Sequence, residues 1–243
     1  MKNKNYIYTV LIATFLVIGI GCKIQQNQES TPNSNTNPLP NIIVILADDL
    51  GYGDISSYHA SNKIKTPNID RLAARGTLFA NAHTQSPICN PSRTSVLTGY
   101  RPSTTGIYGL SPWIREVPEL KDLITIPQYF SINGYKTYSG GKIFHAGYGR
   151  RETDSEFDSL GPPAGVKKRP PEKLAGETPG GNNPLVDWGS FPLQEDEVQD
   201  YVVASWAVDM LENIPQEPYF LSVGFFLPHV PLYAPEASFD LYP

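Results

Sequence analysis

The chain has 243 residues, of which 40% are hydrophobic and 18% are charged, and its formal net charge is −5 at pH 7. This length and apolar content suit a globular protein with one large domain or two small ones. The acidic balance leaves no basic stripe of the kind that nucleic acid requires, so we exclude nucleic acid as a partner.

The N-terminus has the features of an export signal. Lys2 and Lys4 precede an apolar run from Tyr6 to Ile20, which is too short for a typical membrane span. The run leads into Gly21-Cys22, and the segment resembles a bacterial lipoprotein cleavage site in which Cys22 would carry the lipid, although Gly19 replaces the usual aliphatic residue. An ordinary secretory signal with an incidental cysteine is the alternative. We expect export to the periplasm or cell surface, with a lipid anchor in a bacterial membrane.

The composition then divides the chain into three parts. Residues 1–22 form the export signal, and residues 23–40, which are rich in Gln, Asn, Ser, Thr and Pro, form a flexible tether. Residues 41–243 form the folded domain. If Cys22 is lipidated, Cys89 has no partner for a disulfide, because the chain has two cysteines. A free thiol in an exported protein suggests a functional role.

Strands and helices alternate from Asn41 onward. Residues 42–46 are an unbroken apolar run, which predicts a strand buried on both faces of a mainly parallel sheet. Helices are predicted where a threonine precedes a first-turn proline, and they end at glycine or asparagine. The predicted elements up to residue 141 are a helix from Thr66 to Gly76 with Ile69, Leu72 and Ala73 on its apolar face, a strand over 77–80, a helix from Thr125 to Asn133-Gly134, and a strand from Tyr135 to the Gly140-Gly141 turn.

The second half contains one long segment without a clear pattern. Residues 150–192 are dense in Pro, Gly and charge, so we predict an irregular excursion there. A helix over about 195–213 and a strand over 219–226 follow. The alternation predicts an α/β fold, with a mainly parallel central sheet flanked by helices.

Candidate functional side chains come directly after predicted strands, where open α/β sheets build their sites. Asp48 and Asp49 follow the first strand, and paired carboxylates suit calcium or magnesium. Lys142 and His145 follow the Gly-Gly turn, and His229 follows the last strand. Taken singly, two acids in a loop are more often solvated, and a lysine and a histidine in a turn are more often surface groups.

Residues 89–93, with the sequence Cys-Asn-Pro-Ser-Arg, begin another predicted helix. Pro91 suits its first turn and Gly99 its end. Cys89 would lie at the helix N-terminus, where unpaired N–H groups favour an anion, and Arg93 could bind two oxygens of a sulfate. The alternative for an isolated cysteine is a buried structural thiol.

Residues 89–99 resemble the active-site signature of the sulfatase family. Residues 134–145 are similar to the second signature of that family, and residues 49–54 to its metal-binding opening. Pro228-His229-Val230-Pro231 resembles a later Pro-His motif. The resemblance runs from Asn41 to Pro243 and is strongest to iduronate-2-sulfatase-like bacterial members. It implies the N-terminal part of the alkaline-phosphatase-like catalytic domain.

The resemblance implies a modified cysteine and a metal. Cys89 would be oxidised to formylglycine by a formylglycine-generating enzyme, and one hydroxyl of the hydrated aldehyde would attack sulfur. Asp48, Asp49 and the modified Cys89 would bind Ca²⁺, with Mg²⁺ as the alternative. The implied reaction is hydrolysis of sulfate esters on a sulfated polysaccharide or oligosaccharide.

The resemblance also implies roles for four other residues. Arg93 and Lys142 would neutralise the sulfate oxygens, and His145 would assist regeneration of the aldehyde. His229 would bind sulfate or protonate the leaving oxygen. Leu227 stands where relatives often have lysine, which puts substrate preference in doubt.

Sulfatases continue past the equivalent of Pro243 and have there an Asp-His or Asp-Asn pair of metal ligands and another sulfate-binding lysine. The resemblance therefore implies that the C-terminal part of the family fold is absent and that this chain alone is weakly active or inactive. Two other functions stay open. They are hydrolysis of phosphate or phosphonate esters, and non-catalytic binding of sulfated glycans by a lipoprotein.

Overall fold

The computed structural model describes residues 39–58, 64–145, 155–179, 181–192, 194–213 and 216–242. The predicted export signal and nearly all of the predicted tether lie outside these residues. The described residues from Pro40 onward belong to one structural unit. None of the described helices is both long and apolar enough to cross a membrane.

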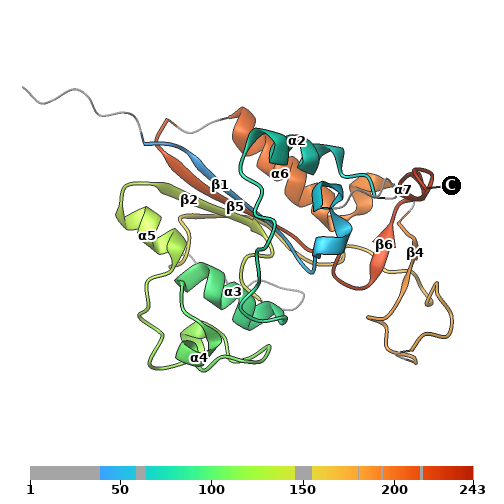
Figure 1. The fold of residues 1–243 in the computed structure, drawn as a ribbon, viewed down its shortest axis with the longest axis horizontal. Helices are drawn as coiled ribbons and strands as arrows, with labels where there is room; N and C mark the ends of the chain where they lie inside the picture. Colours follow the sequence, from blue (N-terminus) through green and yellow to red (C-terminus); the bar gives the residue numbers. More distant parts are fainter. Residues whose placement is uncertain are drawn as a thin grey trace, which may run out of the picture. The chain divides into compact units, whose positions relative to one another are not determined.

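Four parallel strands form the main sheet (Figure 1). Their order is β1 (Ile42–Ala47), β5 (Tyr219–Phe225), β2 (Lys136–Gly141) and β3 (Ser159–Pro163). Because every pairing is parallel, the carboxyl ends of β1, β5 and β2 lie at the same edge. The predicted mainly parallel sheet is confirmed, and its topology brings together residues that are far apart in the sequence.

Helices cover both faces of this sheet. The helix α6 (Gln199–Glu212) contacts β2, β3 and β5, whereas α5 (Ile126–Ile132) packs on β2 from the other side (Figure 1). The helices α3 (Cys89–Thr98) and α4 (Pro102–Thr105) lie on the same side as α5. The predicted flanking helices are therefore confirmed.

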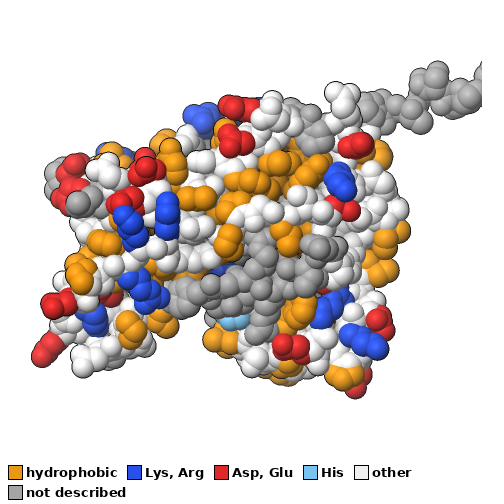
Figure 2. Space-filling model, turned by 180° about the vertical axis from the view of Figure 1, so that it is seen from behind, with side chains coloured by type: hydrophobic (Ala, Val, Ile, Leu, Met, Phe, Trp, Pro, Cys, Tyr) orange, Lys and Arg blue, Asp and Glu red, His pale blue; other side chains and the backbone are white. Residues whose placement is uncertain are grey.

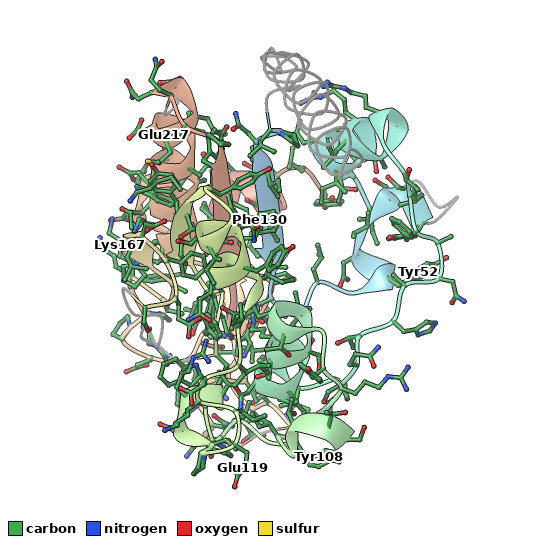
Figure 3. The ribbon with its side chains drawn as sticks, turned by 90° about the vertical axis from the view of Figure 1, so that its left-hand side faces the viewer. Tyr52, Tyr108, Glu119, Phe130, Lys167 and Glu217 are labelled. Atoms are coloured by element: carbon green, nitrogen blue, oxygen red, sulfur yellow. The ribbon has the colours of Figure 1, made fainter. Side chains whose placement is uncertain are left out.

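The core lies on the two faces of β5. On one face, the ring of Phe220 stacks on that of Phe130, with centroids 4.6 Å apart, and Phe130 points from α5 toward the sheet (Figure 3). On the other face, Leu221 and Val223 pack against Val203 of α6. Complete burial of such side chains stabilises the folded state by roughly 1.5–3 kcal/mol each. Because β5 contributes side chains to both clusters, it links the helices on the two faces of the sheet.

The prediction that the first strand is buried on both faces is wrong. In β1, Ile43 and Ile45 are 44% and 59% exposed. Ile43 and Ile45 lie beside Leu221 and Val223 of β5, on the side of the sheet where α6 packs, but α6 packs on β2, β3 and β5 rather than on the edge strand β1. An apolar run indicates a strand, but the helices packed on the sheet decide which of its faces are covered.

Two other predictions need correction. Residues 77–80 do not form a strand, and the segment predicted as irregular contains β3 and β4 (Trp188–Ser190), which pairs with β6 (Leu232–Ala234) in a second sheet. The helix α2 (Pro67–Arg75) follows Thr66 as predicted but buries none of its residues. The remaining short elements are η1 (Tyr52–Asp54), η2 (Ser56–Tyr58), η3 (Ile114–Glu116), η4 (Glu195–Glu197) and α7 (Glu236–Phe239).

Asp187 joins the excursion to the second sheet. Its buried carboxylate accepts hydrogen bonds from the N–H groups of Leu174 and Ala175 and from the hydroxyl of Tyr233. Burial alone would raise the pKa of Asp187, but these hydrogen bonds outweigh it and lower the pKa to about 2. The Asp187 carbonyl also accepts from the N–H of Leu232 at 2.9 Å. The chain is thereby anchored three residues after His229.

Candidate functional site

The ends of three strands meet at one place. The Asp48 N–H, just after β1, donates to the Phe225 carbonyl at 3.1 Å, and the Lys142 N–H, just after β2, donates to the Gly224 carbonyl at 2.7 Å. Gly141 has a positive φ of 78°, and a Cβ there would lie 1.8 Å from the Gly224 oxygen. Glycine at position 141 therefore allows the close approach of β2 and β5 that places Lys142.

The helix α3 brings a thiol and a guanidinium to the same edge. It begins at Cys89 and ends at Gly99, whose left-handed φ of 75° and N–H bond to Ser95 close the last turn. This confirms the predicted helix and puts Cys89 at its N-terminus, where the helix dipole favours a bound anion. The Asn90 side chain donates to the carbonyls of Gly109 and Pro112, at 3.0 and 2.9 Å, and so holds that end in place.

A buried carboxylate with two cationic partners lies at the centre. Asp48 is 4% exposed, and its Oδ1 lies 2.7 Å from Nη2 of Arg93, while its Oδ2 accepts from Nζ of Lys142. Arg93 also donates through Nη1 to the carbonyls of Lys142 and Ile143. Burial raises the pKa of Asp48, but the two cations more than offset it and hold the pKa below its usual value. Asp48 is therefore ionised.

The Cys89 sulfur lies beside Asp48 and Lys142. Its Sγ is 3.7 Å from Oδ2 of Asp48 and 3.8 Å from Nζ of Lys142. Burial and the Asp48 charge together raise the pKa of the Cys89 thiol, and the opposing effects of Lys142 and Arg93 do not cancel them. The unmodified thiol is thus protonated at neutral pH and is a weak nucleophile.

His229 completes the cluster from the segment after β5. Its Nε2 lies 3.8 Å from Oδ2 of Asp49, and its Nδ1 lies 2.6 Å from the Val230 carbonyl. A carbonyl oxygen can only accept, so Nδ1 carries a hydrogen and Nε2 faces Asp49. Asp49 has a positive φ of 62°, which is uncommon for a residue with a side chain and is frequently found at functional sites.

The side chains at this edge form a donor set for a divalent cation. Ligand atoms of Asp48, Cys89 and His229 all lie within 4.8 Å of one another, and Asp49 adjoins them through His229. The sequence predicted Asp48, Asp49 and Cys89 as ligands, and the structure adds the imidazole. Carboxylates suit calcium and magnesium, whereas imidazole and thiolate suit zinc. The set fits a divalent cation without selecting one.

Of the predicted site residues, Asp48, Asp49, Cys89, Arg93, Lys142 and His229 lie together. His145 lies three residues beyond Lys142 and is half-buried, and its assistance to aldehyde regeneration stays a prediction. The sequence did not predict that Arg93 donates hydrogen bonds to the backbone carbonyls of Lys142 and Ile143. It also missed Asp200 and Phe226, which lie behind the site, because neither belongs to a recognisable motif.

Comparisons with known proteins agree with this arrangement. A sulfatase family model matches residues 40–240. A sulfatase of Formosa agariphila is 37% identical to the chain over 242 residues, which cover 94% of the chain and 47% of the relative. Iduronate 2-sulfatase of Homo sapiens is 35% identical over 253 residues, covering 99% of the chain and 43% of the relative. The chain thus spans less than half the length of these two relatives.

Solved structures show the same likeness. Ps i-CgsB in complex with k-i-k-neocarrahexaose superposes with a TM-score of 0.61 at 26% identity, and the match covers 84% of this chain and 48% of that one. The family model spans most of the chain, and its range includes every strand end and the helix start that supply the cluster around Asp48. The chain therefore belongs to the sulfatase family.

Proposed function

We propose that the protein hydrolyses sulfate esters at the edge of the sheet where Cys89 lies. The observation that carries this proposal is the position of Cys89, at the N-terminus of α3 and beside both Asp48 and Lys142, in a chain of the sulfatase family. Because the unmodified thiol is protonated, a modification that replaces it accounts for how this position supplies a nucleophile.

In this proposal Cys89 is the residue that is converted to formylglycine, whose hydrated aldehyde provides the nucleophile for sulfur. Asp48, Asp49, His229 and residue 89 hold a divalent cation, proposed to be Ca²⁺, which supplies positive charge near the sulfate. The described cluster supports this because its two carboxylates balance its two cations, Arg93 and Lys142. A bound divalent ion then leaves a net positive charge that an anionic sulfate ester can neutralise.

The side chains around residue 89 have distinct tasks. Lys142 Nζ, 3.8 Å from the Cys89 sulfur, lies where it can bind an oxygen of a sulfate that approaches residue 89. Arg93 holds Asp48 and the backbone of Lys142 and Ile143, and so fixes both the carboxylate and the lysine. Such preorganised charge stabilises a transition state because it needs no rearrangement during the reaction.

His229 is proposed to act at the leaving oxygen or as a metal ligand. Its Nδ1–H bond to the Val230 carbonyl fixes the ring and directs Nε2 toward Asp49. A neutral ring offers a lone pair at Nε2 for a metal, and a protonated ring offers a hydrogen for a leaving alkoxide. Metal titration of the free protein and the pH dependence of turnover distinguish these two roles.

The proposed substrate is a sulfated polysaccharide or oligosaccharide. Two matched proteins support this class, since one is named iduronate 2-sulfatase and another was solved with k-i-k-neocarrahexaose. The cations at the site suit the sulfate group itself and carry no information about the sugar.

The test combines mass spectrometry with turnover. The full chain is produced with and without a formylglycine-generating enzyme, and the peptide that contains residue 89 is analysed for conversion of the thiol to the aldehyde. Sulfate release from an aryl sulfate and from sulfated oligosaccharides is then measured with added Ca²⁺. We expect turnover that requires conversion and disappears in Cys89→Ala. We expect it to be low, because Ca²⁺ prefers six to eight oxygen ligands and the described residues supply fewer.

Three outcomes would contradict the proposal. Faster cleavage of phosphate or phosphonate esters would assign the site to a different hydrolase. Sulfated-glycan binding that survives Cys89→Ala without turnover in any variant would indicate a binding protein. An unmodified thiol after production with a competent modifying enzyme would remove the proposed nucleophile.

A further inference from the structure

Asp200 connects α6 to the segment that carries His229. It lies in the first turn of α6, where an acidic residue is favoured by the helix dipole. Oδ1 accepts from the N–H of Phe226 and Oδ2 accepts from the N–H of Leu227, both at 2.8 Å. Both oxygens therefore bind the two residues that directly follow β5.

Phe226 transmits this anchor to two groups of the site. Its side chain is 2% exposed, and its ring centroid lies 5.1 Å from Nζ of Lys142 and 4.6 Å from the ring of His229. Its carbonyl also accepts from the N–H of His229 at 3.0 Å. A shift of Phe226 would therefore move a cation–π partner of Lys142 and both the backbone and the ring environment of His229.

The anchor is held under unfavourable electrostatics. Burial raises the pKa of Asp200, the charge of Asp48 raises it further, and the two backbone N–H bonds do not cancel these effects. Burial and the Asp48 charge thus disfavour the ionised form of Asp200, and the two hydrogen bonds at 2.8 Å favour it. An aspartate has two carboxylate oxygens and can accept from both consecutive N–H groups, whereas an asparagine has one side-chain oxygen and would leave one N–H group without this acceptor.

We propose that Asp200 is a positioning residue, which sets the places of His229 and Lys142 through Phe226. The inference rests on the proposed sulfate ester hydrolysis for its catalytic consequence, but the positioning itself is measurable without activity. Asp200 touches neither the substrate region nor the proposed metal ligands directly in the described contacts, and it acts through the peptide groups of residues 226 and 227.

The first test uses the ring of His229 as a spectroscopic probe. The chain has four histidines, so the Hε1 resonance of His229 can be assigned with single His→Gln variants, and the nearby Phe226 ring shifts it. We expect Asp200→Asn to move this resonance. Asp209→Asn, the same chemical change at an exposed position of the same helix, should leave it in place.

The second test is kinetic. We expect kcat/KM of Asp200→Asn to fall roughly 10- to 100-fold, as for other residues that orient active-site groups, while Asp209→Asn retains it. If Asp200→Asn does not fold, Phe226→Leu keeps the backbone bonds and removes the ring, and it should lower kcat/KM because Lys142 and His229 both lose their contact with the ring. An unmoved His229 resonance in folded Asp200→Asn, or an unchanged kcat/KM in Phe226→Leu, overturns the inference. A wild-type chain without turnover, together with a moved resonance, refutes the proposed function and not the positioning.

Discussion

At the scale of single residues, Arg93 shows that a motif residue has more partners than the motif implies. From the sequence, Arg93 was expected to bind sulfate oxygens. In the structure its guanidinium binds the Asp48 carboxylate and the carbonyls of Lys142 and Ile143. The helical spacing from Cys89 to Arg93 could be predicted from caps and turns. The partners could not, because they directly follow β1 and β2, which only the tertiary fold brings near α3.

We predict different costs for losing the two cations that bind Asp48. Arg93→Met should lower the free energy of unfolding by roughly 3–5 kcal/mol, because it breaks a buried ion pair and also leaves two carbonyls without this donor. Lys142→Met should cost less, because Asp48 keeps Arg93 and a buried ammonium is removed. Urea unfolding followed by circular dichroism measures both values. Equal decreases in the free energy of unfolding for the two variants would contradict the role of Arg93 in holding Asp48 and the two carbonyls in place.

At the scale of elements, short sequence signals such as caps, prolines and glycines predicted where helices begin and end, because these positions depend on neighbouring residues. The threonine caps and first-turn prolines located α2 and α5, and the proline and glycine of residues 89–99 located α3. The rule that sites form beyond strand ends predicted most of the cluster. The sequence did not reveal that α6 leaves one face of β1 uncovered, or the pairing of β3 and β4 with other strands, because these depend on contacts between distant segments.

Asp187 gives a pH-dependent prediction for the excursion and the second sheet. Its folded pKa of about 2 lies below the unfolded value near 4. Its contribution to stability is therefore complete above about pH 4 and is lost as the pH falls through about 2. Asp187→Asn should lower the free energy of unfolding by roughly 2 kcal/mol at pH 7. The difference from wild type should shrink below pH 4.

The measurement is urea unfolding of both proteins at a series of pH values. Asp240→Asn, which changes an exposed aspartate near the C-terminal helix, serves as the control and should track wild type throughout. A difference between Asp187→Asn and wild type that stays constant down to pH 2 would refute the assignment of the lowered pKa to this carboxylate.

At the scale of the whole molecule, an apolar surface is open to solvent. Hydrophobic side chains gather across one face in Figure 2, and the exposed apolar residues include Ile43 and Ile45 of the edge strand β1. An exposed apolar edge strand favours pairing with a second chain. We predict concentration-dependent self-association, and we expect Ile45→Lys to reduce it. Ile132→Lys, at a 70% exposed position of α5, is the matched control and should have little effect.

Sedimentation velocity over a range of protein concentrations tests this prediction. Circular dichroism of each variant verifies that the fold is retained. A wild-type chain that stays monomeric at all concentrations, or an equal effect of the two lysine substitutions, would show that β1 is not the associating edge.

Export and lipidation are also properties of the whole protein, and both are proposals here. We predict that a bacterial host that exports the chain attaches a radiolabelled fatty acid to Cys22. The two cysteines of the chain provide the control, because Cys22→Ser should abolish the label whereas Cys89→Ser should retain it. Label in both variants, or in neither wild type nor Cys89→Ser, would contradict lipid attachment at Cys22.

The strand order has a consequence for the time at which the site closes. The central strand β5 comes from residues 219–225, and both β1 and β2 pair with it rather than with each other. A ribosome therefore releases β1, α3 and β2 long before the strand that joins them exists. Until then Asp48 and Lys142 have no shared edge on which to enclose Cys89. For the proposed conversion of Cys89, we expect a modifying enzyme to reach the thiol during synthesis while β5, the strand of the main sheet that is made last, is still missing.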